Sequence, residues 1–497
     1  MQVNLALITL FTFFILALLG RILTRPYISK NSVDQYYWLI IANAFKKQKT
    51  LPITIDNFLL EEKAQAYPPF FGFLIGRIIP RKFQKQLMEF IEFLEVVLLG
   101  VFLWLIGVDT FNIALSMCFF LSAPILITYN SQLTPRIFGD LFLLIVLITQ
   151  VLAHDYAESW ILIAFFLVVS TLFTALLIAA HKMAFQLYLF MIPIWCLLVT
   201  GWHVLLTLLV GVILFILIVG KSFAVYQMKA HLDILQFWYK NCEKLGAHQF
   251  QNSPLYGSAN MDGGNVLHLE GLKGYLKYFR LIISYSPIGI MFPICSFIEK
   301  SWPPDWVMGW FFLIYLLTTL TLFIPKLRFL GGGHLYLFFV IPPSAIYLSF
   351  IPLTSQTLLI LLIGSGLLGF SLFKAYELAK SRNIEKESGF NEMVEFLSSL
   401  KTKNVAVFPL QSADELAFKT EHKILWGGHG LGFKKLEGFF PILTIPLKEI
   451  FDSYKINVVV WNGDYWGNGE KVLTRERLIK KNSVVNFDKW HLAFISS

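Results

Sequence analysis

The sequence predicts a polytopic α-helical membrane protein with about eleven transmembrane helices and a small C-terminal α/β domain. Of its 497 residues, 56% are hydrophobic and only 15% are charged, a balance well outside that of soluble domains. Uninterrupted apolar stretches of about 20 residues recur along the chain, and that length spans a hydrocarbon core of about 30 Å. We therefore expect the chain to cross a membrane many times.

Eleven stretches have the length and composition of transmembrane helices. They lie at 4–20, 88–108, 111–129, 136–153, 159–180, 183–200, 202–220, 280–298, 305–324, 335–352 and 354–375. They predict a transmembrane domain at 1–375 and a soluble domain at 376–497. Two intervening loops, 21–87 and 221–279, are long and polar, so we expect the loops and the soluble domain to carry the chemistry. An odd number of spans places the two termini on opposite sides of the membrane.

The C-terminal domain alternates helix and strand patterns. Helical periodicity predicts helices at 390–400 and 447–455, and β-branched runs predict strands at 403–410, 456–461 and 490–496. About 120 residues can bury a modest core. The glycine-rich segments GGHGLG and WNGDYWGNG follow strand-like runs, so we expect turns at strand ends, where binding groups often lie.

The net charge of +9 does not indicate a nucleic-acid partner. The basic residues are scattered over loops and helix ends, where lipid phosphates are the nearer partners. The four cysteines have no CxxC or metal-ligand spacing. GGGH lacks the Lys-Ser/Thr pair and the preceding strand of a P-loop, and GxSxG and zinc signatures are missing. These observations disfavour a nucleotide-driven pump and a serine or zinc hydrolase.

The first long loop begins with an acid ahead of an amphipathic segment. In NSVDQYYWLIIANAFKK (31–47), apolar residues recur at helical spacing and lysines follow, which predicts an interfacial helix in the headgroup layer. Asp34 lies at its N-terminus, where the helix dipole keeps a carboxylate ionised. Two interpretations stay open: Ser32 or Asp34 caps the helix, or Asp34 is a catalytic base.

A rigid turn follows further along this loop. In YPPFFGFLIGRIIPRK, Tyr67 precedes two prolines, which restrict the backbone and bring a second short apolar helix back to the membrane. The same loop contains Asp56, which is either a second acid or part of a solvated surface.

This order of parts resembles the GT-C superfamily of multi-spanning glycosyltransferases. The parts are a first transmembrane helix, a loop whose acid heads an interfacial helix, the YPP turn and a second interfacial helix. The superfamily includes protein mannosyltransferases, aminoarabinose transferases and oligosaccharyltransferase catalytic subunits, which use polyprenyl-phosphate-linked sugars as donors. The resemblance implies that Asp34 is the catalytic base and that the C-terminal domain lies on the same, extracytoplasmic side. A single acid stands here in place of a DxD or DE pair, which leaves a divalent metal open.

Several residues at helix ends lie on the face of Asp34 by helix count. The resemblance assigns them to the donor phosphate, whose departure needs cations or hydrogen-bond donors. They are Arg136, His181, Lys182, Lys326, Arg328, His334 and Tyr336. The structural alternative is that the basic side chains extend to lipid headgroups. The positive-inside rule alone would put this basic face in the cytoplasm, whereas cations kept for phosphate binding account for an extracytoplasmic face.

Further candidates lie outside this group. Glu92 and Glu95 share one helical face with Glu89 at the start of the second span, and this face must meet water, protein or cations because burying carboxylates in lipid is costly. We consider them, with Asp56 and Tyr67, for acceptor binding or as a second acid. His429 in WGGHGLG is a candidate sugar or lid contact, with an ordinary loop residue as the alternative.

The sequence thus predicts an inverting glycosyltransferase. Its partners are a polyprenyl-phosphate-linked sugar donor, membrane lipids and a glycan, lipid or protein acceptor. Likeness to bacterial GT-C members implies a bacterial inner (cytoplasmic) membrane. The alternatives are a transporter or flippase of a lipid-phosphate or amphipathic substrate, which predicts charged and broken helices near the midplane, and a structural subunit of an envelope complex.

Overall fold

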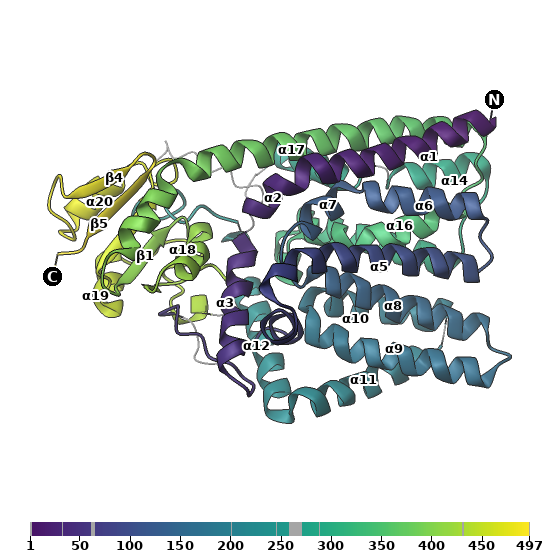
Figure 1. Ribbon diagram of the computed structural model, residues 1–497, viewed down its shortest axis with the longest axis horizontal. Helices are drawn as coiled ribbons and strands as arrows, with labels where there is room; N and C mark the ends of the chain where they lie inside the picture. Colours follow the sequence, from purple (N-terminus) through teal and green to yellow (C-terminus); the bar gives the residue numbers. More distant parts are fainter. Residues whose placement is uncertain are drawn as a thin grey trace.

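The computed structural model describes residues 2–31, 33–60, 65–199, 201–244, 246–257, 271–287, 289–429 and 432–496. A bundle of long helices makes up most of the molecule, and a small α/β domain lies at one end of it (Figure 1). The N-terminus lies at the far end of the bundle, so the N-terminus and the C-terminal domain are at opposite ends.

The bundle contains fifteen of the helices found in the described residues. The first are α1 (Gln2–Leu19), α2 (Arg25–Asn31), α5 (Gln84–Leu105), α6 (Thr110–Ser122), α7 (Pro124–Asn130), α8 (Arg136–Asp155), α9 (Trp160–Ala180) and α10 (Lys182–Leu198). The others are α11 (His203–Val219), α12 (Lys221–Lys240), α13 (Gly271–Tyr285), α14 (Met291–Glu299), α15 (Asp305–Phe323), α16 (Ile341–Ser349) and α17 (Ser355–Ser398).

The protein is an integral membrane protein, but the predicted count of eleven spans is not confirmed. Among the described residues, five helices are long and apolar enough to cross a membrane, or up to seven if each bent pair is one span. One such pair is α6 and α7, which replace the predicted span 111–129 and meet at an angle of 56°. Pro124 begins α7, because a proline cannot continue the hydrogen bonding of the preceding helix.

The second long loop is partly helical, so the prediction of a loop at 221–279 is wrong over 221–240 and over 271–279, where α13 begins. Residues 221–240 form α12, which lies at 114° to α11. Gly220 makes the turn with a φ of 84°, a conformation open to glycine. As a result, α12 turns back over the end of the bundle near the C-terminal domain (Figure 1).

The first long loop contains two helical segments that pack together, and their place in the headgroup layer stays a prediction. The first is α3 (Val33–Lys47), which crosses the end of the bundle (Figure 1). The second comprises α4 (Phe70–Phe73) and the π-helical turn η2 (Leu74–Ile78). They pack closely, since a Cβ added at Gly76 would lie 2.7 Å from the Ala42 carbonyl oxygen.

The C-terminal domain is built on a five-stranded sheet with the order β2-β1-β3-β5-β4. The strands are β1 (Asn404–Phe408), β2 (Lys423–Ile424), β3 (Val458–Asn462), β4 (Val484–Phe487) and β5 (Trp490–Phe494). β1 runs parallel to both β2 and β3, with Val405 opposite Val458, whereas β5 runs antiparallel to β3 and β4. The domain also contains α18 (Ala413–Lys419), α19 (Leu447–Tyr454) and α20 (Gly469–Arg475). The three predicted strands and the helix predicted at 447–455 are confirmed.

A single helix joins the two domains. The predicted span 354–375 and the predicted helix 390–400 both belong to α17, a helix of 44 residues. It runs beside α1 along the bundle and continues onto β4 and β5 (Figure 1). The sequence patterns at its two ends differ because one end packs in the membrane bundle and the other covers a sheet.

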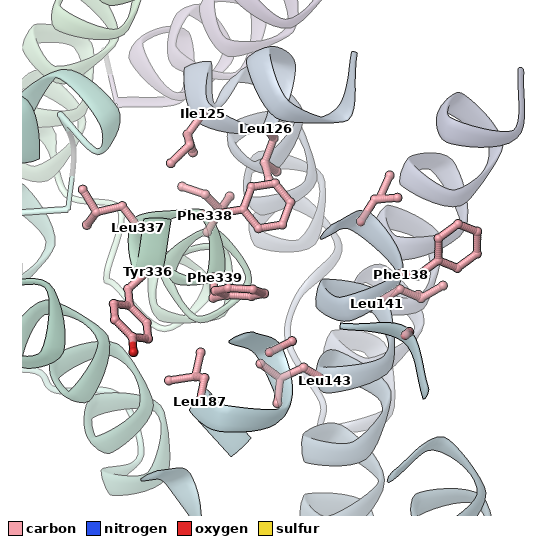
Figure 2. Packing of buried hydrophobic residues seen from close by; sticks show 14 of the residues in the cluster. Ile125, Leu126, Phe138, Leu141, Leu143, Leu187, Tyr336, Leu337, Phe338 and Phe339 are labelled. Carbon is pink, nitrogen blue, oxygen red and sulfur yellow. The ribbon is translucent and has the colours of Figure 1, made fainter. Parts of the chain in front are cut away.

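A cluster of buried apolar side chains packs the helices that carry several of the predicted phosphate-binding residues. Figure 2 shows side chains of α7, α8, α10 and the 3₁₀ segment η6 (Gly333–Val340) packed together. The residues labelled there are Ile125, Leu126, Phe138, Leu141, Leu143, Leu187, Tyr336, Leu337, Phe338 and Phe339. Because Tyr336 and its three successors are at most 1% exposed, η6 is anchored in the core and holds the loop before it in place.

Candidate active site

The side chain of Asp34 faces the C-terminal domain and contacts His429. Asp34 is the second residue of α3, and its Oδ1 lies 3.0 Å from His429 Nε2. The other ring nitrogen, Nδ1, contacts Asp414 Oδ2. Asp414 is fully buried, whereas the side chain of Asp34 is 36% exposed. Within the described residues, Asp34 Oδ2 has no hydrogen-bond partner, so one carboxylate oxygen is open to a ligand.

The charges around this contact keep Asp34 ionised. Burial alone would raise the pKa of Asp34, but the hydrogen bond and charge of His429, with the charge of Arg136, lower it to about 2. Burial alone would lower the pKa of His429, but Asp414 and Asp34 raise it to about 10. Near neutral pH the pair is therefore a carboxylate and an imidazolium.

This geometry bears on the two interpretations of Asp34. In the described part of the chain, its carboxylate bonds to His429 and to no backbone amide of α3. Ser32, the other candidate cap, lies outside the described residues. Asp34 therefore joins α3 to the C-terminal domain, and its role as a base stays a prediction.

Arg136 begins α8 and is close enough to Asp34 for its charge to lower the pKa of that carboxylate. Its guanidinium carbon lies 4.0 Å from the centroid of the Tyr129 ring. The charge of Arg136 also acts on His181 and His334. His181 Nδ1 accepts the backbone N–H at the start of α10, which leaves Nε2 as the remaining donor. Arg136 thus lies near Asp34 and also near His181 and His334, and their binding of the donor phosphate stays a prediction.

An apolar cavity of about 300 Å³ lies between α9, α10 and α12 and reaches Tyr67. The polar residues of its lining include Lys182, Gln186, Gln227 and His231. Lys182 Nζ lies 4.9 Å from the centroid of the Tyr67 ring. Tyr67 contacts Tyr37 edge to face at 5.8 Å, and Tyr37 stacks on His429 at 5.1 Å. A continuous row of rings therefore leads from the cavity to the Asp34–His429 contact.

By sequence, no model of a known protein family matches the chain, and no curated protein does. Solved structures match it over nearly its whole length. ArnT from Cupriavidus metallidurans superposes at a TM-score of 0.56 bound to undecaprenyl phosphate, with 12% identity, and at 0.55 in the apo state, with 11% identity. In both cases the match covers 99% of this chain and 97% of ArnT.

A second match is the oligosaccharyltransferase of Archaeoglobus fulgidus tethered to an acceptor peptide. Its TM-score is 0.50 and its identity 11%, over 94% of this chain and 70% of that one. ArnT and this enzyme are both GT-C glycosyltransferases that depend on polyprenyl phosphates. The protein has the GT-C fold. The fold expected from the first loop is thereby confirmed, although no sequence family model detects it.

The remaining predicted site residues either form hydrogen bonds within the helical bundle or are exposed. Arg328 Nη2 donates to the Tyr278 hydroxyl at 3.1 Å and to the Leu322 carbonyl at 3.0 Å. The Tyr336 hydroxyl donates to the Leu330 carbonyl at 2.9 Å. Lys326 and Asp56 are exposed. None of these four is among the groups that act on Asp34, and their assignment to donor or acceptor stays a prediction.

The glutamates at the start of the second span have separate surroundings. Glu92 accepts from Arg21 Nη2 at 2.9 Å and also contacts Arg25, and its side chain is 3% exposed. Glu95 is fully buried beside Asp140 of α8. The expectation that this face meets protein and cations is confirmed for Glu92. Neither glutamate is among the groups whose charge acts on Asp34.

The sequence analysis missed Asp414, which follows β1 in the segment QSADELAFK. A signal was available, because His429 follows β2 in the same way. β1 and β2 are parallel neighbours, so the segments that leave their carboxyl ends emerge at one edge of the sheet. Such edges often hold binding groups, and here the edge faces α3 (Figure 1).

The sequence left open whether the protein binds a divalent metal, and the described residues contain no evident set of ligands for one. In the ranges that the structure describes, no group of three or more His, Cys, Asp or Glu side chains is arranged to hold an ion. Both ring nitrogens of His429 already face carboxylates. The mechanism proposed below therefore contains no step through a metal.

Proposed function

We propose that the protein transfers a sugar from a polyprenyl-phosphate-linked donor to an acceptor hydroxyl, with inversion at the anomeric carbon. The observation that carries this proposal is the position of Asp34, an ionised carboxylate with an open oxygen where the bundle meets the C-terminal domain. The GT-C fold supports the same reaction class.

Asp34 is the general base in this proposal. Its Oδ2 accepts the proton of the acceptor hydroxyl while that oxygen forms a bond to the anomeric carbon. The bond from the anomeric carbon to the phosphate oxygen breaks, and the polyprenyl phosphate leaves with the electron pair. Arg136, Lys182 and the Nε2–H of His181 stabilise the charge that develops on the phosphate.

The apolar cavity beside Tyr67 accounts for a lipid-linked donor. An isoprenoid chain is apolar and fits a cavity between α9, α10 and α12, while Lys182 in the same lining matches a phosphate. ArnT, which shares the fold, binds undecaprenyl phosphate in one of its structures. A lipid donor also makes a soluble nucleotide sugar unnecessary at this face.

The face that carries the C-terminal domain is extracytoplasmic in this proposal, in a bacterial inner membrane. The acceptor is a glycan, a lipid or a protein. A C-terminal fusion to alkaline phosphatase, which folds only outside the cytoplasm, tests the orientation against a C-terminal green fluorescent protein fusion. Phosphatase activity with a dark fluorescent fusion is expected, and the opposite pattern contradicts the proposed orientation.

The direct test is transfer of a radiolabelled sugar by membranes that contain the wild-type protein. The donors are a panel of polyprenyl-phosphate sugars, with nucleotide sugars for comparison and membranes without the protein as the control. We expect transfer from at least one lipid donor and a product with inverted anomeric configuration by NMR. Absence of transfer from every lipid donor would contradict the proposal.

One observation favours the transporter alternative. Glu95 and Asp140 form a carboxyl pair that is buried within the bundle, and ionisable residues inside a membrane often mark a pathway. Flux of a fluorescent polyprenyl phosphate across proteoliposomes tests it. Flux above that of empty liposomes, without sugar transfer, would favour a transporter.

A further inference from the structure

His429 bridges two carboxylates that belong to different parts of the molecule. Asp34 comes from the interfacial helix α3, and Asp414 comes from α18 in the C-terminal domain. A carboxylate can only accept hydrogen bonds, and a neutral imidazole has a single N–H to donate. Two ionised carboxylates on the two ring nitrogens are both matched only by the doubly protonated imidazolium.

The loop around His429 is shaped for this contact. A Cβ added at Gly427 would collide with Asp414 Oδ1, so only glycine lets the loop pass that carboxylate. Gly428 has a φ of 88°, which glycine adopts without strain. The Trp426 indole N–H donates to the His429 carbonyl at 2.8 Å and closes the turn. The two glycines of WGGHG thus allow the backbone path that places the imidazole against α3.

A second residue of α3 contacts the flat face of the imidazole. The ring of Tyr37, one helical turn from Asp34, stacks on His429 with 5.1 Å between centroids and 27° between planes. The Tyr37 hydroxyl is hydrogen-bonded to Gln65 of the first loop. The imidazole is therefore fixed in position by stacking as well as by its two hydrogen bonds.

We propose that His429, held by Asp414, is a positioning residue for Asp34, so that the C-terminal domain completes the catalytic site. This inference rests on the proposed function. The hydrogen bond to Oδ1 fixes the rotation of the carboxylate and leaves Oδ2 turned to the acceptor hydroxyl. Asp414 in turn fixes the orientation of the imidazolium. Separation of the C-terminal domain from α3 would remove this support from the base.

The charges that face the contact are those of Asp34, Asp414, His429 and Arg136. The folded-state pKa of Asp34 is lowered, so its ionised form is present above that pKa and is lost only as the pH falls through it. After transfer, the proton on Asp34 Oδ2 lies beside the imidazolium and passes to water, which regenerates the carboxylate. His429 keeps both of its protons throughout.

The test compares pH–rate profiles of the full-length His429→Gln and Asp414→Asn variants with the wild type. The wild type is expected to keep its transfer rate down to about pH 4, whereas His429→Gln loses activity as the pH falls below about 5, because an unsupported aspartate ionises near pH 4. At pH 7, His429→Gln is expected to lose about a hundredfold in kcat, the usual cost of a misplaced reacting group.

Two further variants separate positioning from folding. His429→Arg keeps a cation at the site and is expected to restore the acidic limb of the profile, at least in part. His491→Gln removes another histidine of the same domain, which contacts Asn486 away from α3, and is expected to leave the profile unchanged. Equal profiles for His429→Gln and His491→Gln would overturn the positioning role.

A spectroscopic measurement tests the contact without any substrate. The protein contains ten histidines, and ¹⁵N-histidine spectra of the wild type and His429→Gln identify the signal of His429. An imidazolium that persists at pH 8 and disappears in Asp414→Asn is expected. A neutral imidazole at pH 7 in an active wild type would overturn the positioning role alone. An imidazolium in a wild type that transfers no sugar would support the contact and contradict the proposed function.

Discussion

Asp34 of α3 and Glu92 of α5 are two acids that both contact cations, yet their surroundings differ. Glu92 is 3% exposed, and both of its oxygens are used by Arg21 and Arg25. Asp34 is 36% exposed, and only Oδ1 has a partner in the described part of the chain. The difference separates an acid that holds helices together from one that retains a reactive oxygen.

The sequence analysis singled out both residues because each is an acid in an apolar setting. What distinguishes them is the number of carboxylate oxygens that the protein itself occupies. A fully occupied buried carboxylate stabilises the fold, since its removal takes away the counter-ion that two arginines share. A half-occupied, partly exposed carboxylate can accept a proton from a ligand. Substitutions of Asp34 and Glu92 test this distinction directly.

The largest effect is expected for Asp34→Asn. Loss of the general base should lower kcat by about 10² to 10⁴ while the melting temperature changes little. Asp452→Asn, at an exposed position of α19, is the matched control. A kcat for Asp34→Asn within threefold of the wild type would contradict the assignment of the base.

Glu92→Gln should act on stability instead. The substitution removes the buried carboxylate that the partly exposed Arg21 and Arg25 share, and breaking such a pair costs about 3–5 kcal/mol. We expect a lower melting temperature and a lower yield of folded protein. The remaining folded fraction should transfer sugar at the wild-type rate per molecule. If Glu92→Gln is as stable as the wild type but has a lower kcat, Glu92 acts in catalysis and the assigned structural role is wrong.

Lys182→Gln should affect the donor. A charge-assisted hydrogen bond to a phosphate contributes about 1.5–3 kcal/mol, so we expect KM for the lipid donor to rise about tenfold to a hundredfold. Lys182→Arg keeps the charge and should lose less. An unchanged KM would remove the cavity beside Tyr67 from the donor site.

Gly427→Ala is expected to have a smaller effect on stability than Glu92→Gln. Its Cβ collides with Asp414, and overpacking of this kind costs about 1–3 kcal/mol. Transfer should fall as well because the loop that carries His429 must shift. Gly366→Ala in α17 is the control, since nothing lies within 4 Å of its added Cβ. Equal rates for the two variants would show that the loop tolerates the change.

Much of the fold could be predicted from local patterns. Apolar length predicted a membrane protein, and β-branched runs predicted β1, β3 and β5, because most residues of these strands are buried. The angle of 114° between α11 and α12 could not be predicted, because it depends on how α12 packs over the bundle and not on its own periodicity. The sequence did not predict that α17 continues past residue 375, because its residues face the bundle before that point and the sheet after it.

The sequence predicted some residues of the candidate site but not their contact. Asp34 and His429 were each noticed in their own segments, which are 395 residues apart. Their meeting depends on how the C-terminal sheet packs against α3, which no local pattern contains. Asp414 was missed for the same reason, because its importance follows from the parallel pairing of β1 and β2.

The measurement that tests the central claim most directly is donor binding and sugar transfer on one sample of purified Asp34→Asn. Equilibrium binding of the radiolabelled lipid donor and single-turnover transfer are followed side by side with the wild type. We predict donor affinity within about threefold of the wild type and transfer slowed at least about a hundredfold. Transfer that continues at the wild-type rate while donor binds normally would show that Asp34 is not the base.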